Sequence, residues 1–144
     1  MKAITLILLM VVFGKSCNDE SKQDIKSAVI EYTANSRGFF GKIVVKDGKA
    51  FVYREREKTA EPKTITLSEA DEKELIAAFQ EIKLDEIAGM KPPTEKRFYD
   101  GAAMADLKII YKEKTYQSQT FDHKYPPAGI EKLVNKLVSL IKEE

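Results

Sequence analysis

The sequence has 144 residues, of which 43% are apolar, and 24 lysines and arginines stand against 23 acidic residues. This length and composition fit one globular domain, and they exclude a disordered tail, a collagen-like chain and, with one cysteine, a disulfide-held scaffold. A formal net charge of +1 provides no one-signed field for a phosphate backbone, so nucleic acid is not an expected partner.

The first segment has the three parts of a secretory signal. Lys2 supplies a positive charge, residues 3–13 are uncharged and apolar, and Gly14-Lys15-Ser16 precedes Cys17. The apolar run is too short to cross a hydrocarbon core, which requires roughly 20 helical residues. We therefore expect residues 1–16 to be removed as a signal peptide.

Cys17 lies at the expected cleavage site, and a polar run beginning Asn18-Asp19-Glu20 follows it. With this layout the segment resembles a bacterial lipoprotein precursor. The resemblance implies that Cys17 is acylated, for example with palmitate, and that residues 17–24 form a lipidated tether to the membrane. Asn18 is not the aspartate that retains such proteins in the inner membrane, so an outer-membrane or cell-surface location is implied. The alternative is a free thiol behind an uncleaved segment.

The rest of the chain, residues 25–144, is expected to form a single domain. Residues 25–33 are rich in β-branched side chains and predict a first strand. Asp47-Gly48 separates two β-rich runs and predicts a hairpin with a two-residue turn. The turn predicts a register that places Val45 opposite Ala50, Ile43 opposite Val52, and Val44 beside Phe51.

A short strand over 64–67 and a helix over 69–82 are predicted next. Ser68 and Asp71 have the spacing of a capping box, and apolar residues follow at helical spacing. Pro92-Pro93 then favours a long loop over residues 89–101.

Residues 105–111 alternate between apolar and polar, and the alternation resumes over 116–120, which predicts a second hairpin with one buried face. After Pro126-Pro127, apolar residues with helical spacing predict a helix over 130–141. The order of elements predicts an α+β domain: an antiparallel sheet of two hairpins plus an N-terminal strand, with two helices packed on one face.

The open end of the second hairpin brings residues 98–101 beside residues 121–125. One interpretation is a hydrolase in which Asp100 or Asp122 orients His123 as a general base, or a partial metal shell. The other is structural, with Asp100 in a turn, Asp122 on backbone amides and His123 solvated. The sequence contains no nucleophile motif and no second histidine, which favours the structural interpretation; no catalytic residue, metal ion or cofactor is expected.

Arg37-Gly38-Phe39-Phe40-Gly41 places two phenylalanines side by side, and from an extended strand the two rings cannot face the same core. One ring is therefore either an exposed binding anchor or a cover for the end of the core. With this loop before a strand, and with its later strands and C-terminal helix, the domain resembles emfourin-type inhibitors of metalloproteases. That family has a Gly-Gly-Phe-Ala-Gly type of sequence at this loop. The resemblance implies inhibition of an extracytoplasmic protease.

The segments 98–103 and 121–123 are similar to those of uncharacterised small bacterial lipoproteins, a resemblance that implies no activity. The expected function is a lipid-anchored, non-catalytic binding module for a partner in the cell envelope. The candidate contact residues are Arg37, Phe39, Phe40, Phe98, Tyr99, Asp100, Asp122 and His123.

Overall fold

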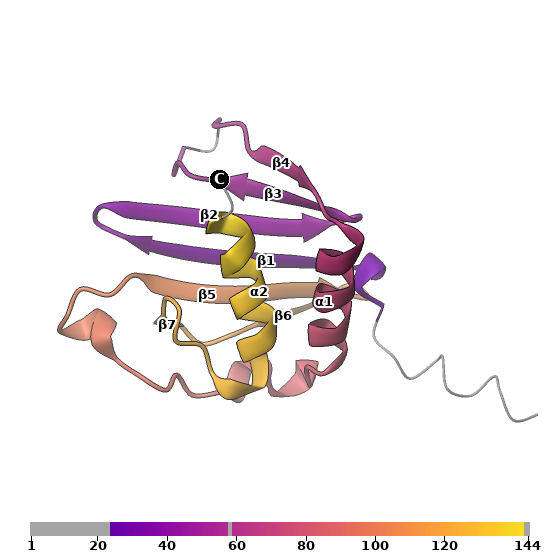
Figure 1. Ribbon diagram of the computed structural model, residues 1–144. Coiled ribbons are helices and arrows are strands. Elements are labelled where there is room, and N and C mark those ends of the chain that lie inside the picture. The colour runs from indigo at the N-terminus through magenta and orange to yellow at the C-terminus, as the bar shows by residue number, and fades with distance from the viewer. Residues whose placement is uncertain (1–23, 58, 143–144) are drawn as a thin grey trace, which may run out of the picture.

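A computed structural model of the protein describes residues 24–57 and 59–142. It contains a seven-stranded antiparallel sheet with two α-helices on one face, which confirms the predicted α+β class (Figure 1). The predicted signal peptide and Cys17 lie outside the described residues. The strands are β1 (Ala28–Ser36), β2 (Phe39–Lys46), β3 (Lys49–Tyr53), β4 (Lys63–Thr66), β5 (Met104–Tyr111), β6 (Lys114–Gln117) and β7 (Phe121–Asp122). The helices are α1 (Glu69–Gln80) and α2 (Glu131–Lys142), with short 3₁₀ turns η3 (Ile25–Ser27), η4 (Leu84–Gly89), η5 (Lys96–Phe98) and η6 (Ala128–Ile130).

The first strand of the chain lies at the centre of the sheet. The strand order is β4-β3-β2-β1-β5-β6, and β7 pairs with the beginning of β5. Both neighbours of β1 are antiparallel to it, so the two predicted hairpins flank the N-terminal strand. Because β1 is hydrogen-bonded along both edges, the sheet continues without interruption from one hairpin to the other.

β1 begins and ends later than predicted. The prediction of a strand from residue 25 was wrong because Asp24 caps a 3₁₀ turn there, its carboxylate accepting the Lys26 amide at 3.0 Å. The strand continues past Thr33 as far as Ser36, which pairs with Phe39 of β2. The Arg37 and Gly38 pair therefore forms the whole β1–β2 turn.

The turn between β2 and β3 has the predicted geometry. Asp47 and Gly48 have φ angles of 52° and 74°, and the register places Val45 opposite Ala50. The β5–β6 turn has the same left-handed backbone at Lys112 and Glu113, with φ angles of 50° and 65°. Neither residue is of the asparagine, aspartate or glycine type that tolerates this conformation well.

The helix α1 has the predicted N-terminal cap and ends at Gln80, two residues before the predicted end. The Ser68 side chain accepts the Asp71 amide at 3.1 Å. The Asp71 carboxylate also pairs with Lys136 of α2 at 2.5 Å, and a hydrogen bond from Lys136 is the largest cause of its lowered pKa. This ion pair joins the two helices across the face of the sheet.

The core lies between the inner face of the sheet and the two helices. Alternate residues of β1, β2, β3 and β5 are buried, as the alternation in the sequence predicted for the second hairpin. The second hairpin is interrupted after β6, because the Ser118 hydroxyl accepts the Leu107 amide in place of a strand carbonyl. The largest fully buried side chains are Tyr32, Phe79, Phe121, Ile30, Ile43, Leu75, Ile87, Leu107, Ile109, Ile130, Leu133 and Leu137.

We predict that Glu113→Gly stabilises the protein by about 1 kcal/mol, because glycine removes the cost of a left-handed backbone at that position. Gly48→Ala is the opposite change at the equivalent turn and should cost about 1 kcal/mol. Urea unfolding measures both effects, as shifts of the midpoint without a change in the dependence of the unfolding free energy on urea concentration. Two variants of equal stability would contradict the prediction.

Candidate functional site

Three loops that are far apart in the sequence meet at one end of the sheet, which we call the aromatic end. It comprises the β1–β2 turn, the segment 94–104 that leads into β5, and the segment 121–125 that follows β6 (Figure 1). The register sets this meeting: Asn35 of β1 lies opposite Met104 of β5, and Met104 lies opposite Asp122 of β7. The structure therefore brings together all three predicted contact segments.

Asp122 is fully buried and fixes the loop before β5. One carboxylate oxygen accepts the Thr94 hydroxyl at 2.6 Å and the Lys96 amide at 2.7 Å. The other accepts the Arg97 amide at 2.9 Å and its guanidinium at 3.2 Å. Burial raises the pKa of Asp122, but the hydrogen bonds from Thr94, Arg97 and Lys96 outweigh it and bring the pKa to about 2. Asp122 is thus an ionised anchor for residues 94–97.

His123 connects the same strand end to the centre of the sheet. Its Nδ1 atom lies 2.8 Å from the hydroxyl of the buried Tyr32. Burial raises the pKa of Tyr32, and the charge of Asp106 raises it further, against a hydrogen bond from the Lys124 amide. The neutral Tyr32 hydroxyl therefore serves as a fixed hydrogen-bonding partner for the imidazole inside the core.

The phenylalanines of the predicted loop point to opposite faces of the sheet, as an extended strand requires. Phe39 stacks on His123 with ring centroids 5.3 Å apart, and it lies so close over Gly41 that a Cβ there would be 3.3 Å from the ring. Phe40 packs under the guanidinium of Arg56. The same guanidinium donates to the carbonyls of Ser36 and Phe39, so Arg56 holds the β1–β2 turn in place.

Most of the exposed large apolar side chains gather at the aromatic end. Six such side chains are exposed among the described residues, and five of them are here: Phe39, Phe98, Tyr99, Met104 and Tyr125. Phe98 and Tyr99 are each 72% exposed. The guanidinium of Arg97, itself almost buried, lies 4.4 Å from the centre of the Phe98 ring, and Lys96 lies 4.8 Å from that of Tyr125. The rings are thus backed by cations and open on their outer sides.

The predicted site residues therefore have different roles in this structure. Asp100 is exposed on the loop, and its amide donates to the Lys96 carbonyl at 2.7 Å. Both oxygens of Asp122 are engaged by the loop, and Nδ1 of His123 is engaged by Tyr32. This arrangement favours the structural interpretation of the aspartates over a general-base role.

The sequence pattern did not reveal several residues that build this end. The strand pattern over residues 25–33 includes Tyr32 without indicating its contact with His123, and no pattern in the sequence indicates that Arg56 contacts the β1–β2 turn. Thr94 had only its position after Pro92-Pro93 as a signal. Each of these residues acts through a contact with a distant segment, which local patterns do not encode.

Among residues 24–57 and 59–142, no group of three histidine, cysteine or carboxylate side chains is placed to hold a metal ion. Within the same ranges, no helix is long and apolar enough to span a membrane. No protein-family model matches the chain, and no curated protein matches it. The resemblances to lipoproteins and to emfourin-type inhibitors stay predictions.

We predict that Asp122→Asn destabilises the protein by about 2 kcal/mol, because it leaves the buried Arg97 side chain without its charge partner. Asp100→Asn is the matched control at an exposed position and should change stability by less than about 0.5 kcal/mol. The folded pKa of Asp122 lies below its ordinary value, so its contribution is present above pH 4 and is lost as the pH falls towards 2.

Urea unfolding at several pH values measures this effect. The parent should lose stability more steeply than Asp122→Asn between about pH 4 and pH 2. Parallel curves for the two proteins would show that Asp122 is not the ionised anchor.

Proposed function

We propose that this protein is a lipid-anchored component of the cell envelope whose domain binds a protein partner non-covalently through the aromatic end. The observation that carries the proposal is the gathering of five exposed large apolar side chains on loops that hydrogen bonds to other segments hold in place. Scattered exposed apolar residues are normal on a protein surface, whereas a contiguous group is typical of an interaction site.

The contacts that hold the three loops on the domain support binding by preformed loops. Asp122 holds residues 94–97, Tyr32 holds His123, and Arg56 holds the β1–β2 turn. Loops that are ordered before association lose less conformational entropy when they bind. Tyrosine and arginine are among the residue types enriched at the positions that dominate binding energies, and Tyr99 is 72% exposed at this end.

The lipid anchor is the second part of the proposal. Its support is the sequence around Cys17, with a signal-like segment before it and a polar tether after it. Two or three acyl chains, at about 0.8 kcal/mol per buried methylene, suffice for stable attachment without a polybasic patch. The outer membrane or the cell surface is the location that we propose. Intact mass of the membrane-extracted protein should show loss of residues 1–16 and added acyl mass at Cys17.

We predict that Phe98→Ala combined with Tyr99→Ala abolishes capture of the partner in cells, while stability changes by less than about 0.5 kcal/mol, because both rings are exposed. The measurement is in-cell crosslinking of the lipidated protein followed by mass spectrometry. Ile110→Ala, on the open face of the sheet, is the matched control and should capture the same partner as the parent.

If the parent, the double variant and the control capture identical sets of proteins, the aromatic end is not the contact surface. Loss of capture in the control as well would indicate a contact across the open face of the sheet instead. Either result would overturn the proposed surface.

Inhibition of an extracytoplasmic protease is a second candidate, favoured by the β1–β2 turn. Arg37 and Gly38 are exposed at its tip, and Arg56 fixes the carbonyls on both sides of it. A rigid projecting turn of this kind fits a loop that enters an enzyme cleft.

We predict that, if the protein is such an inhibitor, Arg37→Ala weakens inhibition of a metalloprotease about tenfold or more. Lys46→Ala, an exposed change at the opposite end of β2, should leave inhibition unchanged. Titration of protease activity against the purified protein measures both. Protease activity that does not depend on the dose of the parent would end this candidate.

A further inference from the structure

The chain enters the domain at the end of the sheet where β1 begins. This end is opposite the aromatic end. Asp24 is the first described residue, and its amide donates to the Tyr111 hydroxyl at 3.2 Å. Tyr111 lies opposite Ala28 in the sheet and lines a cavity of about 530 Å³. We call this the tethered end. The chain therefore leaves the domain from a fixed point beside the cavity.

The length of the tether limits how the domain can stand on a membrane. From Cys17 to Asp24, a fully extended chain spans at most about 25 Å. The nine residues of β1 span about 27 Å between the tethered end and the aromatic end. If Cys17 is acylated, the tether is no longer than the strand, and this length favours an orientation in which the aromatic end points away from the membrane. The tethered end is the part held near the lipid headgroups.

Exposed lysines from four separate segments gather at the tethered end. The strand registers place the β2–β3 and β5–β6 turns beside the start of β1, and residue 83 lines the same cavity as residue 112. These lysines are Lys26, Lys46, Lys49, Lys83, Lys112 and Lys114, and the same segments carry the exposed acids Asp24, Asp47, Asp85, Glu86 and Glu113. This end therefore presents charges of both signs, as a phospholipid headgroup with a phosphate and an ammonium does. Lysine is a compact charge that suits phosphate groups, so the lysines at this end can bind the phosphates of headgroups.

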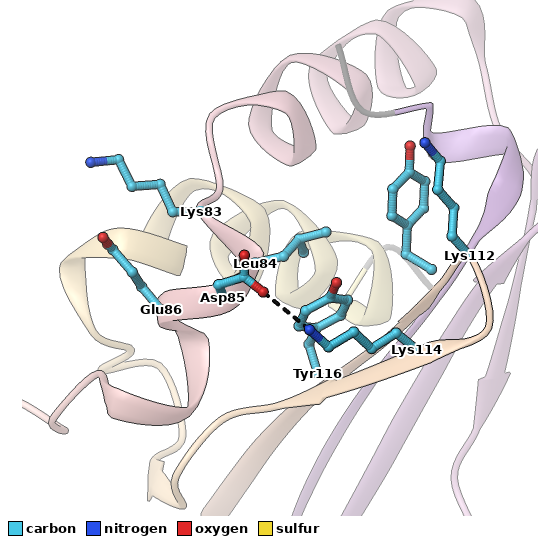
Figure 2. A pocket seen from close by; sticks show the side chains of 8 residues that line it. Lys83, Leu84, Asp85, Glu86, Lys112, Lys114 and Tyr116 are labelled. Atoms are coloured by element: carbon cyan, nitrogen blue, oxygen red, sulfur yellow. Dashed lines mark hydrogen bonds and ion pairs between the residues drawn. The ribbon is translucent and has the colours of Figure 1, made fainter. Parts of the chain in front are cut away.

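The cavity lies between η4 and the β5–β6 hairpin and offers both signs of charge. Lys114 reaches across to Asp85, with Nζ and Oδ1 3.3 Å apart, while Lys83 and Lys112 lie on opposite sides of the opening (Figure 2). Both members of the ion pair are more than half exposed, so the pair is weak and a phosphate can replace Asp85 as the partner of Lys114. Asp85 and Glu86 can then accept an ammonium group.

We propose that the tethered end docks on the phospholipid surface that holds the anchor, and that the cavity binds a headgroup phosphate through Lys112 and Lys114. This inference rests on the proposed acylation of Cys17. Docking of the tethered end directs the aromatic end away from the lipid. The partner of the aromatic end is then a protein at a distance from the membrane surface.

The test uses the full acylated protein in vesicles of phosphatidylethanolamine and phosphatidylglycerol, with acylation first verified by intact mass. Since Cys17 is the only cysteine and acylation consumes it, one introduced cysteine can carry an environment-sensitive fluorophore. Glu113→Cys places the probe at the tethered end. Gly38→Cys places it on the opposite turn, where a Cβ meets no atom within 4 Å.

A nitroxide on the lipid headgroups should quench the probe at position 113 and leave the probe at position 38 almost unquenched, because the two probes lie at opposite ends of β1. Lys112→Glu with Lys114→Glu should reduce quenching at position 113 by about fivefold or more. Lys91→Glu with Lys132→Glu makes the same change of charge at exposed positions outside the cavity and should leave the quenching unchanged.

Equal quenching at the two positions, or stronger quenching at position 38, would overturn the inference while the lipid anchor stands. Equal losses of quenching at position 113 in the two double variants would show that docking depends on net charge alone. That result would exclude a role of the cavity. A protein without acyl mass would instead refute the proposed anchor, so the two failures are distinguishable.

Discussion

The pairing of β1 along both edges is the constraint on which the rest of the structure depends. β2 and β5 can take their places in the sheet only because β1 lies between them, and the two helices cover the face that these strands share. The same strand separates the two ends of the molecule. Its first residues lie beside Tyr111 and Asp24, and its last residues lie beside the β1–β2 turn and Met104. Because of the direction of this one strand, the proposed lipid anchor and the proposed contact surface lie at opposite ends of the molecule.

Two fully buried polar residues, Asp122 and Tyr32, hold the segments 94–97 and 121–123 of the aromatic end in place. Asp122 carries its charge in a fully buried position because four donors surround it, and removing any of them would leave part of that charge unsatisfied. The buried Tyr32 hydroxyl likewise makes a hydrogen bond with His123, and Phe39 stacks on the His123 ring. Asp122 and His123, which the sequence offered as possible general-base residues, thus hold the loops of the aromatic end in place. The exposed rings beside them, Phe98 above all, are the groups that remain available to a partner.

Elements that depend on short-range signals were predictable. The Asp47-Gly48 turn, the Ser68 cap and the alternation along β5 each depend on residues close together in the chain, and each has the predicted form. The bounds of β1 were less predictable, because a strand extends as far as its partners pair with it and those partners lie elsewhere in the sequence. The interruption after β6 has the same cause, since the Ser118 hydroxyl bonds an amide of the neighbouring strand.

The sequence by itself determined the class of fold, the two hairpins, the face of the second hairpin that is buried, and the meeting of residues 98–101 with residues 121–125 at one end of the sheet. The reason is that turn geometry and the periodicities of strands and helices are local properties of the chain. That the β1–β2 turn joins these two segments there was decided by the pairing of β1 with β2 and β5. Only the tertiary structure decided what the residues of those loops do. The pKa of Asp122, the partner of His123 and the exposure of Phe98 depend on Thr94, Tyr32 and Arg97 in space, and burial and hydrogen bonding are set by such neighbours.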